Sequence, residues 1–390
     1  MLFVDRLKVQ EFYPKKCDYI YLKNDKNEKF LDLSSGNILG NNNKIAESAI
    51  IQTLHQNLLN HSCDIENETL IELQNTLCKL AGFFEKKDNG NIRIIGGAKL
   101  QNSAKESIDL AISIARNRYN ILCDRKYNEI ICIDGYSLLN DISLNNLNGF
   151  KIAKNNDLKT IETCITEHTS AILLETIEIT NRLNEYNTIF WQKLRQLCDK
   201  HEILLILDET KCGCGKAGSF FAYEKYNIKP DIVCIANDFV NGFSCGACIF
   251  NNESLKFYKQ SIYNINNNIN CMYVNIASKM IETLSNKLLS NRINKIENSI
   301  KFIFRDLLEA HSNIIDFIKI KGLMCYLEIN SDINIKNFIE IIMLNGLLVK
   351  HLEGNKLLLT FPAICEEKHI KEAKQIIEVS IGEIDIIERY

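Results

Sequence analysis

The sequence predicts an α/β protein in which helices cover both faces of a mostly parallel sheet, followed by a smaller α+β domain. Short continuous apolar runs, bounded by polar turns, recur at 129–133, 171–174, 203–207, 231–236 and 246–250. Segments with helical periodicity precede or separate these runs, as at 103–119 and 190–201. Because strands buried on both faces are apolar along their whole length, this alternation indicates a covered parallel sheet.

The segments before this region add two short strands and two helices. Residues 18–34 have the pattern of two strands around a turn. Apolar residues spaced three and four apart predict helices at about 44–60 and 69–81. We therefore expect an N-terminal segment at 1–50, ahead of a large domain at 51–265.

The C-terminal part follows a polar, asparagine-rich stretch at 264–270. Its pattern predicts a long helix at about 274–310, a strand near 324–329 and a helix near 335–345, with a strand–helix pair at the end. We expect this part, 266–390, to form the small α+β domain.

Composition excludes several classes of protein. Of the 390 residues 46% are hydrophobic, which is enough for a large core, and the net charge of −3 with well-mixed signs argues against a nucleic-acid patch. No stretch of about 18 uncharged apolar residues could span a bilayer. The start has no apolar signal-peptide core. The 15 cysteines are thus expected to be reduced thiols in a cytoplasmic protein.

The most informative stretch is 203–250, where an apolar strand is followed by Asp208-Glu-Thr-Lys-Cys-Gly-Cys-Gly-Lys-Ala-Gly, then Phe221-Ala-Tyr-Glu, Pro230-Asp-Ile and Gly246-Ala. It resembles the class III (fold type I) pyridoxal-phosphate aminotransferases, in the branch of acetylornithine, ornithine and 4-aminobutyrate aminotransferases. That family has the order Asp-Glu-Val-Gln-x-Gly-x-Gly-Arg-Thr-Gly, Phe-Ala-x-Glu, Pro-Asp-Ile, and a lysine before Gly-x-Gly-Gly-Gly-Phe-Pro-x-Gly-Ala.

The resemblance extends more weakly over nearly the whole chain. Matching segments are Phe30-Leu-Asp-Leu-Ser-Ser-Gly, Asn102-Ser-Ala-Lys-Glu-Ser, Asp134-Gly-Tyr, Leu174-Glu and Leu357-Leu-Leu-Thr-Phe-Pro. It implies a fold-type-I transferase with a seven-stranded-type sheet, and a homodimer with its active site at the interface.

The resemblance also implies a pyridoxal 5′-phosphate site, with Asp208 as the carboxylate that pairs with the pyridine nitrogen. A strand-end aspartate that caps a turn is the alternative. Ser103 and Ala104 fall in the phosphate loop, Tyr136 at the aromatic that stacks on the ring, and Glu175 at the strand end before a glycine loop. Ala104 replaces a glycine there, which restricts the approach of backbone to a phosphate.

The Schiff-base lysine of the family is replaced by Asn237. An amide cannot form the imine, and Asp238 beside it cannot either. Loss of that general base removes a contribution of about 10²–10⁴-fold to the rate. Glycine is scarce as well, with 17 residues against a usual share of about 7%, and the missing ones fall in loops that would face a ligand.

Lys211 occupies the glutamine position of the family, near the phenolic oxygen of the cofactor. It could be a displaced Schiff-base lysine, or a turn lysine in water. Cys212, Cys214, Cys245 and Cys248 form a CxC and a CxxC set. Such sets can bind zinc, but Cys248 falls inside an apolar strand, and we expect no metal site.

Two functions are favoured by the sequence, ahead of a third and weaker interpretation, a thiol–metal protein that reuses the fold. The first is a class III aminotransferase-like pseudoenzyme or atypical member, which pairs with itself or with an active paralogue. The alternative is an active transaminase that uses Lys211 and transfers nitrogen from an ornithine-, acetylornithine- or 4-aminobutyrate-like amine to 2-oxoglutarate.

Overall fold

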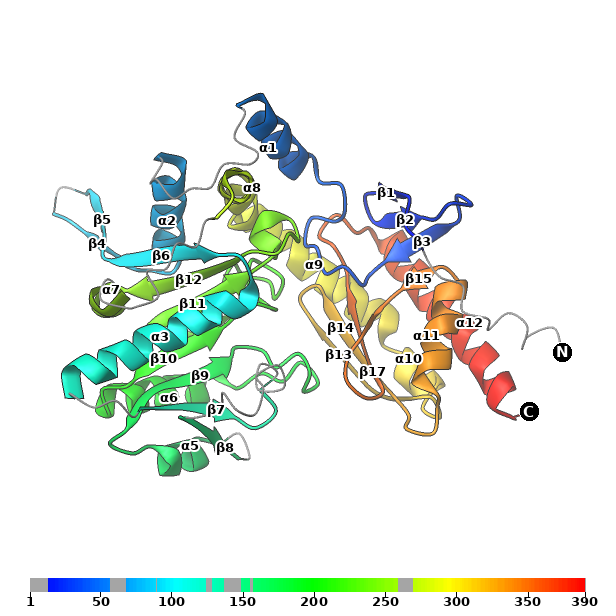
Figure 1. The fold of residues 1–390 in the computed structure, drawn as a ribbon. Helices are drawn as coiled ribbons and strands as arrows, with labels where there is room; N and C mark the ends of the chain where they lie inside the picture. Colours follow the sequence, from blue (N-terminus) through cyan, green and yellow to red (C-terminus); the bar gives the residue numbers. More distant parts are fainter. Residues whose placement is uncertain are drawn as a thin grey trace. The chain divides into compact units, whose positions relative to one another are not determined.

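The computed structural model describes residues 13–56, 68–88, 90–123, 128–136, 149–154, 157–258 and 269–389. The chain divides into two compact units. One, here called the large unit, comprises Ser48–Cys214 and Ser219–Ser285. The other, the small unit, comprises Met1–Glu47, Gly215–Gly218 and Asn286–Tyr390, so that the N-terminal segment belongs with the C-terminal part of the chain (Figure 1).

The large unit is built on a mixed seven-stranded sheet. Its strands are β6 (Gly96–Gln101), β7 (Glu129–Ile133), β8 (Phe150–Ala153), β9 (Thr169–Glu175), β10 (Leu204–Asp208), β11 (Ile232–Ala236) and β12 (Gly246–Asn251). They lie in the order β6-β12-β11-β10-β9-β7-β8, and β12 alone runs antiparallel to its neighbours. The predicted mostly parallel sheet is therefore confirmed.

The strands of this sheet are buried along both faces because helices of the large unit cover them. The helices of this unit are α1 (Lys44–His55), whose first turn falls in the small unit, α2 (Glu68–Leu80), α3 (Ala104–Cys123), α5 (Leu158–Cys164), α6 (Thr188–Lys200), α7 (Asn252–Tyr258) and α8 (Cys271–Leu284). Figure 1 shows α3 crossing one face of the sheet, with α6 on the other. Ile108, Ala111 and Ala115 of α3 join Leu173 and Ile206 in one buried core.

Three helices of the large unit follow the predicted ranges. The expected helices at 69–81, 103–119 and 190–201 correspond to α2, α3 and α6. The helix expected at 44–60 corresponds to α1, and the part of it from 57 on lies outside the described residues, as does most of the asparagine-rich stretch at 264–270. A short hairpin of β4 (Phe84–Lys86) and β5 (Ile92–Ile94) and the 3₁₀ turns η3 (Ala222–Tyr226) and η4 (Asp238–Val240) complete the unit.

The small unit holds two four-stranded sheets. The first joins β1 (Lys16–Asp18), β2 (Tyr21–Lys23), β3 (Lys29–Asp32) and β15 (Leu347–Leu348). The second joins β13 (Ile315–Lys321), β14 (Met324–Ile329), β16 (Lys350–His351) and β17 (Lys356–Thr360). Its helices are α9 (Lys287–Phe304), α10 (Leu307–Ala310), α11 (Ile335–Leu344) and α12 (Glu367–Arg389). The predicted strand near 324–329 and helix near 335–345 are confirmed.

The prediction of a single long helix at 274–310 is wrong. Helix α8 ends at Leu284 and α9 begins at Lys287. Asn286 has extended backbone dihedrals, and its side chain accepts a hydrogen bond from the Leu288 amide. Asparagine favours such an N-cap over the interior of a helix, because its side chain competes for backbone hydrogen bonds. A second break follows Phe304, before α10.

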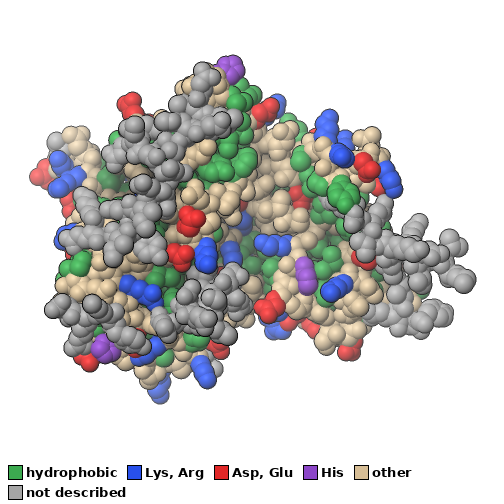
Figure 2. Space-filling view, viewed as in Figure 1, with side chains coloured by type: hydrophobic (Ala, Val, Ile, Leu, Met, Phe, Trp, Pro, Cys, Tyr) green, Lys and Arg blue, Asp and Glu red, His purple; other side chains and the backbone are tan. Residues whose placement is uncertain are grey.

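The surface carries both signs of charge. On the face drawn in Figure 2, basic and acidic side chains are interspersed, in agreement with the small net charge of −3. Within the described ranges, no helix has the length and apolar character needed to cross a membrane.

Candidate functional site

The sheet of the large unit brings the predicted site residues to one edge, here called the carboxyl edge. Strands β7, β9, β10 and β11 are parallel and end there, and so does β6. The predicted residues each end one of these strands or follow one within a few positions: Ser103 and Ala104 after β6, Tyr136 after β7, Glu175 on β9, Asp208 and Lys211 on and after β10, and Asn237 after β11. Open α/β sheets bind ligands at this edge.

Asp208 is buried, with 4% of its surface exposed. Its Oδ1 accepts hydrogen bonds from the Thr210 amide at 2.9 Å and the Thr210 hydroxyl at 2.7 Å. Its Oδ2 accepts one from the Tyr136 hydroxyl at 2.8 Å. Both carboxylate oxygens are thus bonded to groups of the protein itself.

Tyr136 is also buried, at 5% exposure. Burial raises the pKa of its hydroxyl well above the ordinary value, and the negative charge of Asp208 raises it further. The hydroxyl therefore remains protonated and donates to the carboxylate. Sequence reasoning found the residue but expected its ring to stack on a ligand, and the hydroxyl contact was not anticipated.

Thr210 is a site residue that sequence reasoning missed. It lies two positions after Asp208, and both its amide and its hydroxyl bond to the same carboxylate oxygen. An aspartate that bonds the backbone two residues on is the usual Asx turn. The Asp-x-Thr spacing was therefore the signal that would have identified this residue.

Lys211 and Glu175 form an ion pair at the carboxyl edge. The Lys211 ammonium lies 3.2 Å from Glu175 Oε1. The Glu175 side chain is 4% exposed, whereas that of Lys211 is 42% exposed. Neighbouring register positions on β9 and β10 bring Glu175 beside Asp208, so that Lys211 faces a buried carboxylate on one side and water on the other.

Asn237 ends β11 with an unusual backbone conformation, φ 58° and ψ −54°. Its amide donates to the Cys245 carbonyl at 2.8 Å, and its carbonyl accepts from the Val240 and Gly242 amides. Its side-chain Oδ1 accepts from the Cys245 amide at 3.4 Å. Asn237, which the resemblance places at the family lysine position, therefore closes the loop that joins β11 to β12.

The predicted phosphate loop forms an N-cap of helix α3. The Ser103 hydroxyl accepts a hydrogen bond from the Glu106 amide at 3.2 Å, while the Glu106 carboxylate accepts from the Asn102 amide at 3.1 Å. This arrangement differs from a capping box in that the glutamate accepts from the residue before the N-cap and not from the N-cap itself. Ala104 is the first residue of α3. Ser103 thus has a structural role already, and Glu106 adds negative charge at this helix N-terminus.

The loop after β9 is held by hydrogen bonds between polar side chains. Glu178 accepts hydrogen bonds from the side chains of Asn181, Asn184 and Tyr186, at 2.7, 3.1 and 2.5 Å. These contacts define the loop by side-chain bonding, and they were not predicted from the sequence.

Glu209, next to Asp208, is a buried carboxylate with a different role. It is 1% exposed and accepts from the Ala222 and Tyr223 amides at 2.7 and 2.8 Å, which fixes the start of η3. Burial raises its pKa to about 7, although the two amide hydrogen bonds act in the opposite direction.

The four cysteines of the CxC and CxxC sets are all buried. Cys248 is opposite Cys234 on the neighbouring strand β11. Burial raises the pKa of the Cys212 thiol well above its usual range and that of Cys245 to about 12. Among the described residues, no three His, Cys, Asp or Glu side chains gather as metal ligands do.

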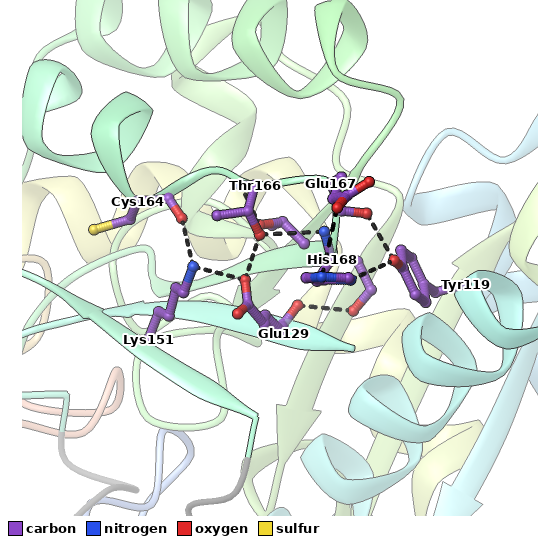
Figure 3. A network of polar contacts seen from close by, with 9 residues as sticks. Tyr119, Glu129, Lys151, Cys164, Thr166, Glu167 and His168 are labelled. Carbon is purple, nitrogen blue, oxygen red and sulfur yellow. Dashed lines mark hydrogen bonds and ion pairs between the residues drawn. The ribbon is translucent and has the colours of Figure 1, made fainter. Parts of the chain in front are cut away.

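A second polar network lies at the opposite, amino-terminal edge of the same sheet (Figure 3). Glu129 at the start of β7 pairs with Lys151 at 2.8 Å and accepts from the Thr166 hydroxyl at 2.6 Å. The Tyr119 hydroxyl donates to the Glu167 carbonyl at 2.6 Å. These contacts tie the strand starts of β7 and β9 to α3, far along the strands from the carboxyl edge.

Comparison with known proteins gives a consistent set of relatives. The family described as Aminotransferase class-III matches residues 107–381. Acetylornithine aminotransferase of Aquifex aeolicus is 25% identical over 374 residues, with 92% of this chain and 94% of that protein covered. Acetylornithine aminotransferase of Clostridium acetobutylicum is 28% identical over 328 residues, covering 79% of this chain and 81% of that protein.

Solved structures of similar proteins have the same fold. N-acetylornithine aminotransferase from Stenotrophomonas maltophilia superposes with a TM-score of 0.82 at 19% identity, covering 99% of this chain and 100% of that one. Acetylornithine aminotransferase from Elizabethkingia anophelis gives a TM-score of 0.81 at 21% identity, with 97% of each chain covered. The expected fold-type-I architecture is confirmed.

Proposed function

Because the chain belongs to the class III aminotransferase family, whose members depend on pyridoxal phosphate, we propose that it is a homologue that has lost transamination. The observation that carries this proposal is Asn237. It stands at the position of the lysine that forms the Schiff base, and its amide oxygen is hydrogen-bonded to the Cys245 amide. A carboxamide has no basic amine with which to bind the aldehyde or move a proton.

The rest of the carboxyl edge does not fit the cofactor either. The carboxylate of Asp208, which would have to face the ring nitrogen, is bonded to Tyr136 and Thr210. In the loop before α3, Ser103 accepts a hydrogen bond from the Glu106 amide, and Ala104 stands where the resemblance places a glycine, which restricts the approach of the backbone to a phosphate. We therefore derive no chemical step through pyridoxal phosphate for this chain.

The competing proposal, an active transaminase that uses Lys211, has less support. Its amine lies at the carboxyl edge, as that proposal requires, but 3.2 Å from the buried Glu175 carboxylate. An amine that forms an imine must reach the aldehyde carbon, whereas this amine is held at the Glu175 carboxylate. Transamination of an ornithine- or acetylornithine-like amine would require this pair to break.

An absorbance titration with pyridoxal phosphate tests the proposal. We expect the wild-type chain to show no aldimine band at the blue end of the visible spectrum once excess cofactor is removed. An acetylornithine aminotransferase with its lysine intact serves as the positive control.

A stable wild-type band that disappears in Lys211→Ala would establish the displaced lysine and overturn the proposal. The Asn237→Lys variant is the third arm of the titration. A band that forms in this variant but not in the wild type would attribute the loss of the aldimine to this residue.

We further propose that the chain acts through association, as a homodimer or with a lysine-bearing paralogue, in the cytoplasm. One observation supports this role: the fold is retained over the length of the relatives, whereas Asn237 replaces the lysine that the resemblance places at this position.

A further inference from the structure

The contact between Tyr136 and Asp208 spans the carboxyl edge of the sheet. Tyr136 follows β7, Asp208 ends β10, and β9 lies between these two strands. The tyrosine therefore reaches past the end of β9, where Glu175 is located, to place its hydroxyl 2.8 Å from Asp208 Oδ2. Both side chains are buried, so the hydrogen bond forms where water does not compete.

We propose that Tyr136 is an internal ligand of Asp208 that excludes ligands with a protonated ring nitrogen. Oδ1 of the carboxylate already accepts two hydrogen bonds from Thr210, and Oδ2 accepts the tyrosine hydroxyl. The carboxylate thus has donors at three of its four acceptor positions, and a pyridine-type ring that takes the position of the tyrosine on Oδ2 must displace that hydroxyl. Displacement would leave a buried hydroxyl to find another partner, and a buried polar group without one is costly.

The direction of the hydrogen bond strengthens this exclusion. A carboxylate accepts hydrogen bonds only, and a phenol that keeps its proton is a donor to it. A protonated ring nitrogen is also a donor, so the tyrosine and the ligand require the same oxygen. The Tyr136 hydroxyl thus donates to Asp208 Oδ2 as a protonated ring nitrogen would.

Tyr119 provides a matched comparison within the same unit. Its hydroxyl is also hydrogen-bonded, at 2.6 Å, but to the backbone carbonyl of Glu167 at the amino-terminal edge (Figure 3). Removing the Tyr119 hydroxyl is the same chemical change as removing that of Tyr136, but it leaves the hydrogen bonds of Asp208 intact. The Tyr119→Phe variant is therefore a control for the loss of a tyrosine hydroxyl as such.

The inference deepens the proposed function and rests on it, and its test uses a probe that is independent of Schiff-base chemistry. Pyridoxine carries the pyridine ring without an aldehyde or a phosphate, so it cannot form an imine with any lysine. Equilibrium dialysis measures its affinity for the wild type, Tyr136→Phe, Tyr136→Ala and Tyr119→Phe. The wild-type aldimine band tests the proposed function, and pyridoxine binding tests the exclusion.

We expect Tyr136→Phe or Tyr136→Ala to bind pyridoxine at least about tenfold more tightly than the wild type, the change expected for one hydrogen bond to a charged group. The Tyr119→Phe variant should match the wild type. Adding Asp208→Asn to the better-binding variant should abolish the gain, because an amide is a weaker partner for a cationic nitrogen.

Three outcomes would overturn the inference. Wild type and both Tyr136 variants could bind pyridoxine equally, the gain could persist in the Asp208→Asn background, or a wild-type complex could place the ring nitrogen against Asp208. Two variants of different size keep the test decisive if one of them fails to fold.

Discussion

Asn237 ends β11 in a conformation that few side chains adopt. Its φ of 58° combined with ψ of −54° lies outside the regions open to L residues, and such strain costs on the order of 1–3 kcal/mol. Asparagine tolerates positive φ better than most residues, and here its side chain also bonds the Cys245 amide. The residue is therefore suited to the structure of the loop, apart from any chemistry.

We predict that glycine is tolerated at position 237 better than alanine. Both Asn237→Gly and Asn237→Ala remove the side-chain hydrogen bond, but only glycine relieves the strain at positive φ. The glycine variant should be more stable by about 1 kcal/mol, measured as the free energy of urea unfolding.

The opposite order is expected at Asn298, which is exposed inside helix α9, because glycine there costs about 1 kcal/mol relative to alanine. A more stable alanine variant at both positions would show that the backbone conformation at 237 is not strained.

At the scale of single residues, sequence reasoning located side chains but not their partners. The motif after β10 identified Asp208, Lys211 and Asn237, because strand ends and their following turns are fixed by local pattern. The bond between Tyr136 and Asp208 depends on how a side chain crosses β9, and 72 positions of sequence separate its ends. No local pattern carries that information.

At the scale of elements, the apolar runs predicted the strands well, because a strand buried on both faces leaves an unambiguous signal. The error fell at Asn286, where one side chain that caps α9 outweighed continuous helical periodicity. The cap depends on one side chain, whereas helical periodicity is judged from the apolar residues of several turns. The periodicity therefore gave no sign of a break at a single residue.

The connection from β10 to η3 depends on Glu209, and this dependence predicts a stability that varies with pH. Burial raises the pKa of Glu209 to about 7, while its value in the unfolded chain is about 4.3. Between about pH 4.3 and pH 7 the Glu209 carboxyl group is therefore protonated in the folded chain and ionised in the unfolded chain. The contribution of Glu209 to stability is therefore greatest below about pH 4.3, declines as the pH rises towards 7, and is level above it.

The variant Glu209→Gln, which does not titrate, isolates this contribution. Glutamine should be destabilising because its amide nitrogen cannot accept from the Ala222 or Tyr223 amide. The destabilisation should be larger at about pH 5.5 than at about pH 8, by on the order of 1–2 kcal/mol in urea unfolding. An equal cost at both values would contradict a raised pKa for this carboxyl group.

At the scale of the whole molecule, the chain keeps the architecture of its relatives while the carboxyl edge has changed. It aligns with 94% of the length of the Aquifex aeolicus enzyme, and the core strands stay apolar. The contrast between a retained fold and an asparagine at position 237 is the ground for the proposed association role.

We expect the purified chain to form a stable complex with a lysine-bearing class III aminotransferase when the two are co-expressed, because relatives with one fold present related surfaces for pairing. Size-exclusion chromatography with light scattering gives the mass of the complex, and mass spectrometry identifies both chains in one peak. A tagged copy of the lysine-bearing enzyme, co-expressed with its own untagged copy, is the control for dimer exchange. If the chain elutes as a monomer at concentrations where the control pairs, association through the family fold is excluded.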